Sequence, residues 1–141
     1  TGYFNHKYIP RAGLSGAQQE LNYGINYRAI RYADVLLMAA EANSRKASPN
    51  DSKAQNYLNQ VRARAFGNNS RASRSTGATL TKEIWNERRL ELAMEGHRFF
   101  DLVRTGEAAA TIPGFIAGKH EVFPIPQTEI DISGLTQNAG Y

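Results

Sequence analysis

A dense alternation of charged and apolar side chains between Glu87 and Leu102 constrains the fold more than any other part of this sequence. On a helix, residues three or four positions apart share one face. Here that face would carry Ile84, Arg88, Glu91, Glu95, Arg98 and Leu102. Apolar side chains flank these charges, so much of the face should contact protein rather than water. Because an ion buried alone costs several kcal/mol, the charges need partners of opposite sign.

Such partners occur within the stretch and in an earlier one that begins near Arg31. Within the stretch, the pairs at helical reach are Arg88–Glu91, Glu91–Glu95–Arg98 and Arg98–Asp101. We predict a structural ion-pair network that fixes the register of two packed helices. Its members would be Arg31, Asp34, Glu41, Arg88, Glu91, Glu95, Arg98 and Asp101. An Arg98→Ala change would then orphan a buried partner, at a cost of about 3–5 kcal/mol.

Two helices should precede this stretch. Residues 28–45 lack Gly and Pro and are rich in Ala and Leu, which favours a helix that is apolar nearly all round and mostly buried. Residues 52–66 carry an apolar stripe at helical spacing, and Gly67 is a suitable C-terminal stop. A short connection between the two predicts an antiparallel pair, the building unit of tetratricopeptide-like arrays.

The remaining segments differ in composition. Residues 67–80 are small, polar and aperiodic, which is typical of a mobile loop. Thr81 can cap a third helix toward Arg104, which Gly96 kinks or divides. Prolines and glycines recur beyond that helix and disfavour long helices. We therefore predict a mainly α chain with a loop-rich lead (1–27), a helix pair (28–66), a mobile loop (67–80), a signature helix (81–106) and an extended, largely non-helical tail (107–141).

Composition excludes several classes of protein. The 141 residues suffice for about one domain, and the lack of cysteine excludes disulfides, thiolate zinc sites and cysteine nucleophiles. The longest apolar run, Val35–Ala40, is far shorter than the ~20 residues of a membrane-spanning helix. A net charge of +4 permits nucleic-acid binding through Arg71 and Arg74, but no aromatic residues interleave with them, so no nucleic-acid partner is expected.

Catalytic and metal-binding interpretations rest on few residues. Glu91 and Glu95 could act as acid and base in a helical glycoside hydrolase. Arginines near each glutamate would lower its pKa, however, which suits a structural anion better than a general acid. His6, His97 and His120 show no spacing typical of metal ligands, and no nucleotide fingerprint occurs. We therefore expect no metal, no cofactor and no enzymatic activity.

Four blocks of sequence stand out in order along the chain. They are YRAIRYADVLLMAAEA (27–42), LNQVRARA (58–65), NERRLELAMEGHRFFDLVR (86–104), and FPIPQTEID with LTQNAGY (123–131 and 135–141). Together these blocks resemble the SusD/RagB family of nutrient-binding outer-membrane lipoproteins, over nearly the whole chain. The departures are small: Ala139 stands where the family's tail has proline, and Met94 where an aromatic residue is common.

The resemblance implies a SusD-like fold of tetratricopeptide-type helices packed as an α-α superhelix. It also implies capture rather than chemistry. Family members hold glycans or peptides at the cell surface for import through a SusC-like TonB-dependent transporter, and a lipid anchor attaches them to the outer membrane. Members are several times longer than this chain, so residues 1–141 resemble the C-terminal segment of a larger protein, which would carry the anchor.

Capture of a glycan needs flat aromatic faces against the sugar ring and fixed polar groups that bind its hydroxyls. The aromatic candidates lie in or beside the irregular lead: Tyr3, Tyr8, Tyr23 and Tyr27. The alternative is that these tyrosines pack against the core, a common role for large aromatic side chains.

Overall fold

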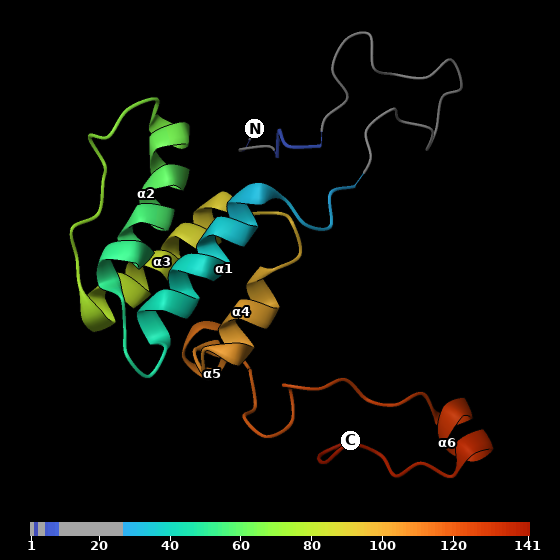
Figure 1. Ribbon diagram of the computed structural model, residues 1–141. Coiled ribbons are helices and arrows are strands. Elements are labelled where there is room, and N and C mark those ends of the chain that lie inside the picture. The colour runs from blue at the N-terminus through green and yellow to red at the C-terminus, as the bar shows by residue number, and fades with distance from the viewer. Residues whose placement is uncertain (1, 3–4, 9–26) are drawn as a thin grey trace, which may run out of the picture. The chain divides into compact units, whose positions relative to one another are not determined.

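The structure is a computed structural model that describes residues 2, 5–8 and 27–141. The chain divides into two compact units, one ending at His97 and the other beginning at Arg98. In the described part of the chain all regular structure is helical and no strand occurs, which confirms the predicted mainly α fold (Figure 1). No helix in this part is long and apolar enough to cross a membrane.

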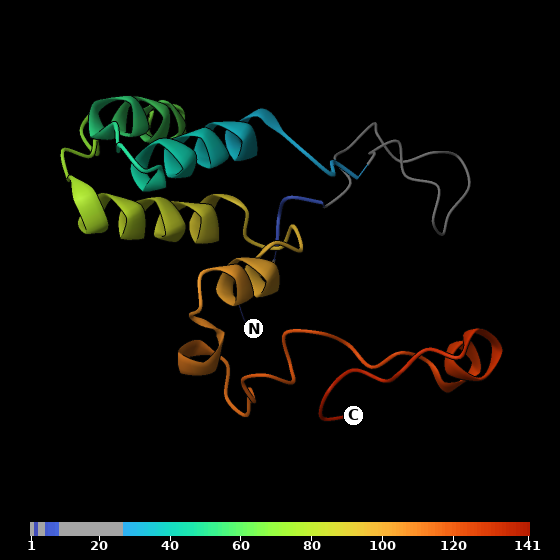
Figure 2. The ribbon, with the colours of Figure 1, turned by 60° about the horizontal axis from the view of Figure 1, so that its bottom comes forward.

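Three helices build the described part of the first unit. They are α1 (Tyr32–Arg45), α2 (Asp51–Phe66) and α3 (Gly77–Glu91). The short connection between α1 and α2 makes them antiparallel neighbours, as predicted. Figure 2 shows α3 as a second layer against this pair. The arrangement gives each helix a face directed at a common interior.

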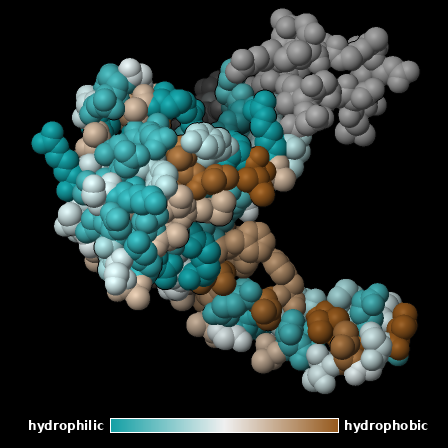
Figure 3. Space-filling model, in the orientation of Figure 1, coloured by the Kyte–Doolittle hydropathy of each residue, from teal (hydrophilic) through white to brown (hydrophobic). Residues whose placement is uncertain are grey.

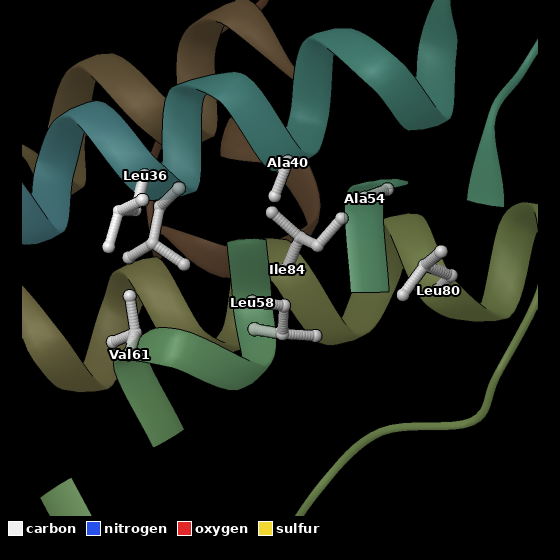
Figure 4. Close-up of a cluster of buried hydrophobic side chains, with 8 residues drawn as sticks. Leu36, Ala40, Ala54, Leu58, Val61, Leu80 and Ile84 are labelled. Atoms are coloured by element: carbon white, nitrogen blue, oxygen red, sulfur yellow. The ribbon is translucent and has the colours of Figure 1, made fainter. Parts of the chain in front are cut away.

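Apolar side chains from all three helices form the core of the first unit. The cluster consists of Leu36, Leu37, Ala40, Ala54, Leu58, Val61, Leu80 and Ile84. Figure 4 shows these side chains directed at one another between the helices. Full burial of one leucine or isoleucine side chain contributes about 1.5–3 kcal/mol. This cluster is therefore the main hydrophobic contribution to the stability of the unit.

The first helix is shorter and more exposed than predicted. It begins at Tyr32 rather than at residue 28, because Arg31 has an extended backbone (φ −137°, ψ 161°). The side chain of Arg31 pairs with Glu91, the last residue of α3, and with Glu95 in the turn that follows, and these tertiary contacts override helix propensity. Tyr32, Val35 and Met38 lie three residues apart and are exposed. Figure 3 shows hydrophobic surface over the first half of α1.

Capping residues fix both ends of α2. Asn50 is the N-cap, and its side-chain oxygen accepts a hydrogen bond from the backbone N–H of Lys53 at 2.9 Å. Gly67 ends the helix with φ 71°, in the left-handed region that glycine adopts most readily. The stop at Gly67 is as predicted.

The polar segment between α2 and α3 is hydrogen-bonded to side chains of α2. Asn59 donates to the carbonyl of Ser73 at 3.1 Å and accepts from its N–H at 2.6 Å. Gln55 donates to the carbonyl of Ser75 at 2.8 Å. α3 already begins at Gly77, so residues 77–80 are helical rather than part of the loop. The small polar residues that predict a loop thus also provide its hydrogen-bonding groups.

The signature helix predicted over 81–106 is not continuous. A turn separates the end of α3 from α4 (Arg98–Arg104). In this turn Met94 and Gly96 have positive φ angles of 65° and 81°, which a right-handed helix excludes. Glu95 therefore lies outside any helix, and the helical spacing that placed it on one face with later residues does not apply.

The second unit is largely irregular. It contains α4, α5 (Ala108–Thr111) and α6 (Gln127–Ser133). Gln137 holds the tail together, because its side chain accepts from the N–H of Ile125 at 2.8 Å and donates to the carbonyl of the same residue at 2.9 Å. The hydroxyl of Tyr141 donates to the carbonyl of Val122 at 2.9 Å. Side-chain contacts of this kind replace regular backbone pairing in the tail.

Truncation of a core side chain should destabilise the first unit. Leu58 is fully buried, so Leu58→Ala leaves a cavity and should lower the free energy of unfolding by about 2–5 kcal/mol. Trp85, the only tryptophan, lies on α3, so urea unfolding followed by its fluorescence reports on this unit. The exposed Leu90 is the matched control, and Leu90→Ala should change stability by less than about 0.5 kcal/mol. Equal losses for the two variants would contradict this assignment of the core.

Candidate functional site

Opposite charges meet in the interface between α1 and α3. Nη1 of Arg88 donates to Oδ1 of Asp34 at 2.7 Å, and both side chains are only 6% exposed. Glu41 is also buried on α1 and accepts from Nη1 of Arg45 at 2.8 Å. A buried charge without its partner costs several kcal/mol, so the pair of Arg88 and Asp34 favours one alignment of the two helices, whereas Glu41 and Arg45 both lie on α1.

A second set of charges joins α2 to α3. Nε of Arg62 donates to Oε2 of Glu87 at 2.8 Å, and Nη1 donates to Oε2 of Glu83 at 3.2 Å. Burial raises the pKa of Glu83, but hydrogen bonds from Ser73 and Ser75 and the charge of Arg62 outweigh burial. The pKa of Glu83 therefore lies below the usual glutamate value.

Arg31 joins the start of α1 to the end of α3. Its Nη1 donates to Oε1 of Glu91 at 2.5 Å, and its Nε donates to Oε2 of Glu95 at 2.8 Å. Its Nη2 donates to the carbonyl of Glu91 and to Oε1 of Glu95. Lys7 adds hydrogen bonds to the carboxylate of Glu95 at 2.5 Å and to the carbonyl of Glu91 at 2.6 Å. These two cations thus hold the turn that follows α3.

The charge state of this junction follows from its contacts. Burial raises the pKa of Glu95, but hydrogen bonds from Arg31 and Lys7 and the charges of both cations outweigh it, so the pKa lies below the usual value. Burial lowers the pKa of Arg31, but hydrogen bonds to Glu95 and Glu91 dominate and raise it. A general acid requires a raised carboxyl pKa, so the lowered pKa of Glu95 argues against the glycoside hydrolase alternative.

A cleft of about 430 Å³ lies beside the junction. The described residues that line it are His6, Lys7, Tyr8, Arg28, Arg31, Arg64, Glu91 and Glu95. The side chains of Glu91 and Glu95 are only 11% and 4% exposed, whereas that of Arg64 is 62% exposed and donates to Glu91 at 2.5 Å. Carboxylates predicted to serve only as scaffold therefore also line an accessible cleft, together with exposed cations.

Two of the four predicted ligand-binding tyrosines lie together. The rings of Tyr8 and Tyr27 stack with their centroids 6.1 Å apart and their planes at 23°. Tyr8 lines the cleft, and the hydroxyl of Tyr27 donates to the carbonyl of Glu95 at 3.2 Å. Tyr27 is 66% exposed, so it is not part of the core. Tyr3 and Tyr23 lie outside the described residues, and ligand contact by any of the four stays a prediction.

Two predicted members of the ion-pair network belong to α4. Arg98 is exposed at the start of α4, so the expectation that it is sequestered is wrong. The turn after α3 is the reason, because it ends the helical face on which Arg98 was placed. Asp101 is buried and accepts from Nε of Arg104 at 2.8 Å. Substitution of the exposed Arg98 should therefore cost far less than the 3–5 kcal/mol expected for a buried ion pair.

Sequence reasoning missed the cations that surround Glu91 and Glu95. Lys7, Arg28 and Arg64 line the cleft, but none was nominated from the sequence. A signal was available, because Arg64 lies in the block LNQVRARA and Arg28 lies in the block that begins at residue 27. Their partners are distant in sequence, however, so spacing alone does not reveal these contacts.

Arg71 and Arg74, the basic candidates for nucleic-acid binding, do not line the cleft, whereas His6 does. The guanidinium of Arg71 lies over the ring of Phe66, 5.8 Å from its centroid, in a cation–π arrangement. Arg74 is exposed in the segment before α3. In the described part of the chain, no three or more carboxylates and histidines are grouped so as to hold a metal ion.

Comparison with known proteins identifies the class to which this helical chain belongs. The sequence model of the SusD family matches residues 1–118. SusD-like protein P2 of Formosa agariphila is 32% identical over 151 aligned residues, which cover 96% of this chain and 30% of that protein. SusD-like protein P25 of the same organism is 32% identical over 124 residues, covering 79% of this chain and 23% of that protein. The chain belongs to the SusD family, and it spans 30% or less of the length of these two curated relatives.

Removal of the buried arginine should be far more costly than removal of its exposed neighbour. Arg88→Met leaves Asp34 buried without this partner and should lower the free energy of unfolding by about 3–5 kcal/mol. Arg89 is the next residue of the same helix and is exposed, so Arg89→Met should change stability by less than about 0.5 kcal/mol. Adding Asp34→Asn to Arg88→Met should recover part of the loss, measured by urea unfolding. Similar losses for the two arginine variants would refute a buried pair.

The first unit should lose stability on acidification. Because the pKa values of Glu83 and Glu95 are lower in the folded chain than the value of about 4.3 in the unfolded chain, their contribution is complete above that pH. It is lost as the pH falls through the folded-state values. Urea midpoints from Trp85 fluorescence should therefore change little between about pH 7 and 5 and fall below that range.

Two variants test this origin of the pH dependence. Glu95→Gln removes one titrating group and should make the loss of stability with falling pH less steep. Glu129→Gln removes an exposed carboxylate and should leave the steepness unchanged. An unaltered pH profile in Glu95→Gln would show that the junction around Arg31 does not contribute to it.

Proposed function

We propose that this chain is part of a surface protein that captures a glycan, or another oligomeric nutrient, without transforming it. Membership of the SusD family supports the class of function. The stacked pair of Tyr8 and Tyr27 at the charged cleft carries the assignment of a ligand site. Aromatic faces pack against the apolar faces of sugar rings, and convergent polar groups bind the hydroxyls.

The proposal extends to the setting in which the protein acts. The parent protein would be held at the outer surface of the outer membrane by a lipid anchor. It would pass its ligand to a SusC-like TonB-dependent transporter. Binding and release alone would suffice for this task, with no metal, cofactor or nucleic acid. This setting is supported by family membership alone.

Capture is favoured over hydrolysis by the contacts of the two carboxylates. Glu91 is bonded by Arg31 and Arg64, and Glu95 by Arg31 and Lys7. The pKa of Glu95 lies below the usual glutamate value, so this carboxylate is a poor proton donor. In the proposed function the two carboxylates orient the cations of the cleft and do not react with the ligand.

Loss of the cleft aromatic should weaken glycan binding. Tyr8→Ala removes one ring of the stacked pair and should raise the Kd of an oligosaccharide ligand about 3- to 10-fold, measured by calorimetry on the 141-residue chain. The ligand would first be identified on an array of oligosaccharides. Tyr32→Ala is the matched control, because Tyr32 is exposed on α1 and does not line the cleft.

The same experiment separates capture from catalysis. Incubation of the bound oligosaccharide with the chain should release no reducing ends. Turnover that disappears in Glu91→Gln would replace the proposal by a hydrolase. Equal weakening by Tyr8→Ala and Tyr32→Ala would remove the cleft as the ligand site.

A further inference from the structure

The charges around the cleft indicate which class of glycan it takes. We propose that the cleft binds an anionic oligosaccharide, one that carries carboxylate or sulfate groups on its sugar rings. This inference rests on the proposed function, because it names the ligand class for the same cleft. Its basis is the number of cations, their exposure and their free hydrogen-bond donors.

Among the described residues of the cleft lining, positive charge exceeds negative charge. Four cationic side chains, those of Lys7, Arg28, Arg31 and Arg64, stand in this described lining with two carboxylates, those of Glu91 and Glu95. Arg31 and Lys7 lie within 2.5–2.8 Å of the carboxylates and balance them. The charges of Arg28 and Arg64 therefore remain in excess. A cleft with an excess of one sign concentrates ligands of the opposite sign.

The arginines that carry the excess charge are exposed and retain free donors. Arg28 is exposed, and it donates no hydrogen bond to the described residues. Arg64 is 62% exposed, and in the described part of the chain it hydrogen-bonds through Nη2 alone. A guanidinium has five N–H donors in a planar fork. Both arginines thus retain donors for a ligand at the cleft.

The chemistry of these donors selects planar or tetrahedral oxyanions. An arginine fork binds a carboxylate or sulfate group through two parallel N–H···O bonds, which neutral hydroxyls match less well. The ring of Tyr8 in the same lining suits a pyranose face, so a small inorganic anion would use only part of the site. The combination of an aromatic face with two exposed arginines that retain free donors matches a charged sugar.

Three tetrasaccharides test this assignment on the 141-residue chain by calorimetry. The probes are tetragalacturonate, the uncharged β-1,4-galactotetraose and a sulfated neocarratetraose. At least one anionic probe should bind about tenfold or more tightly than galactotetraose at low salt. Raising the ionic strength from about 0.05 to 0.3 M should weaken the anionic probe and leave the neutral one unchanged. The order of the two anionic probes identifies the group that is bound.

Variants of single arginines locate the effect. Arg28→Gln should weaken the preferred anionic probe about fivefold to tenfold and leave galactotetraose unchanged. Arg74→Gln removes the same charge from an exposed position before α3, whereas the cleft includes Glu91 at the opposite end of α3. The control should therefore bind like the wild type. Equal weakening by Arg28→Gln and Arg74→Gln would show a general charge effect and overturn the proposal.

The outcomes distinguish this inference from the proposed function. If neutral and anionic probes bind equally and Tyr8→Ala weakens both, the cleft captures glycans but the anionic class is wrong. If the chain binds none of the probes and no oligosaccharide on the array, the proposed function itself fails. Tighter anionic binding that depends on Arg28 but not on Arg74 supports both.

Discussion

The arrangement of the first unit depends on the guanidinium of Arg31. α1 begins one residue after it, and α3 ends at Glu91, one of its two carboxylate partners. Its other partner, Glu95, lies in the turn that leads away from α3. Without this cation, Glu91 and Glu95 would keep only Arg64 and Lys7 as partners among the described residues, two side chains that are more exposed than Arg31. One side chain therefore determines where α1 starts and holds the carboxylates that line the cleft.

The apolar core and the buried charges contribute differently to this arrangement. Burial of leucine and isoleucine side chains is not directional, so it would tolerate displacement of one helix along another. The pair of Arg88 and Asp34, 2.7 Å apart, is satisfied in one alignment of α3 against α1. A shift by one helical turn, about 5.4 Å, would separate both charges from their partner. Hydrophobic burial thus supplies stability, and the ion pairs select the alignment.

Local sequence signals predicted the elements whose causes are local. The cap at Asn50 and the stop at Gly67 depend on neighbouring backbone groups, and both ends of α2 were predicted within one residue. The helix break near Met94 was underestimated, because only Gly96 lowers helix propensity there. The break is held by cations from elsewhere in the chain, and propensity does not include such contacts.

The site was less predictable than the fold because its contacts are distant in sequence. Lys7 and Glu95 are 88 positions apart, and Arg64 and Glu91 are 27 apart. Rules for pairs three or four residues apart apply within one helix and cannot identify such partners. They placed Arg98 beside Glu95, whereas the folded chain supplies Lys7 and Arg31. The sequence therefore indicated which residues would form ion pairs, but only the tertiary structure identifies their partners.

The exposure of each arginine separates its structural role from its role toward a ligand. Arg31 is 21% exposed and is bonded to both carboxylates, so an incoming anion would have to displace two short hydrogen bonds. Arg64 pairs with Glu91 alone among the described residues, and its side chain is largely in solvent. An ion pair at such an exposed position contributes less than about 1 kcal/mol. An anionic ligand can therefore recruit Arg64 with little loss of stability, while Arg31 keeps the cleft assembled. The arginine that stabilises the helix packing and the arginine proposed to bind the ligand line the same cleft. They differ in exposure and in the number of carboxylates that each one contacts.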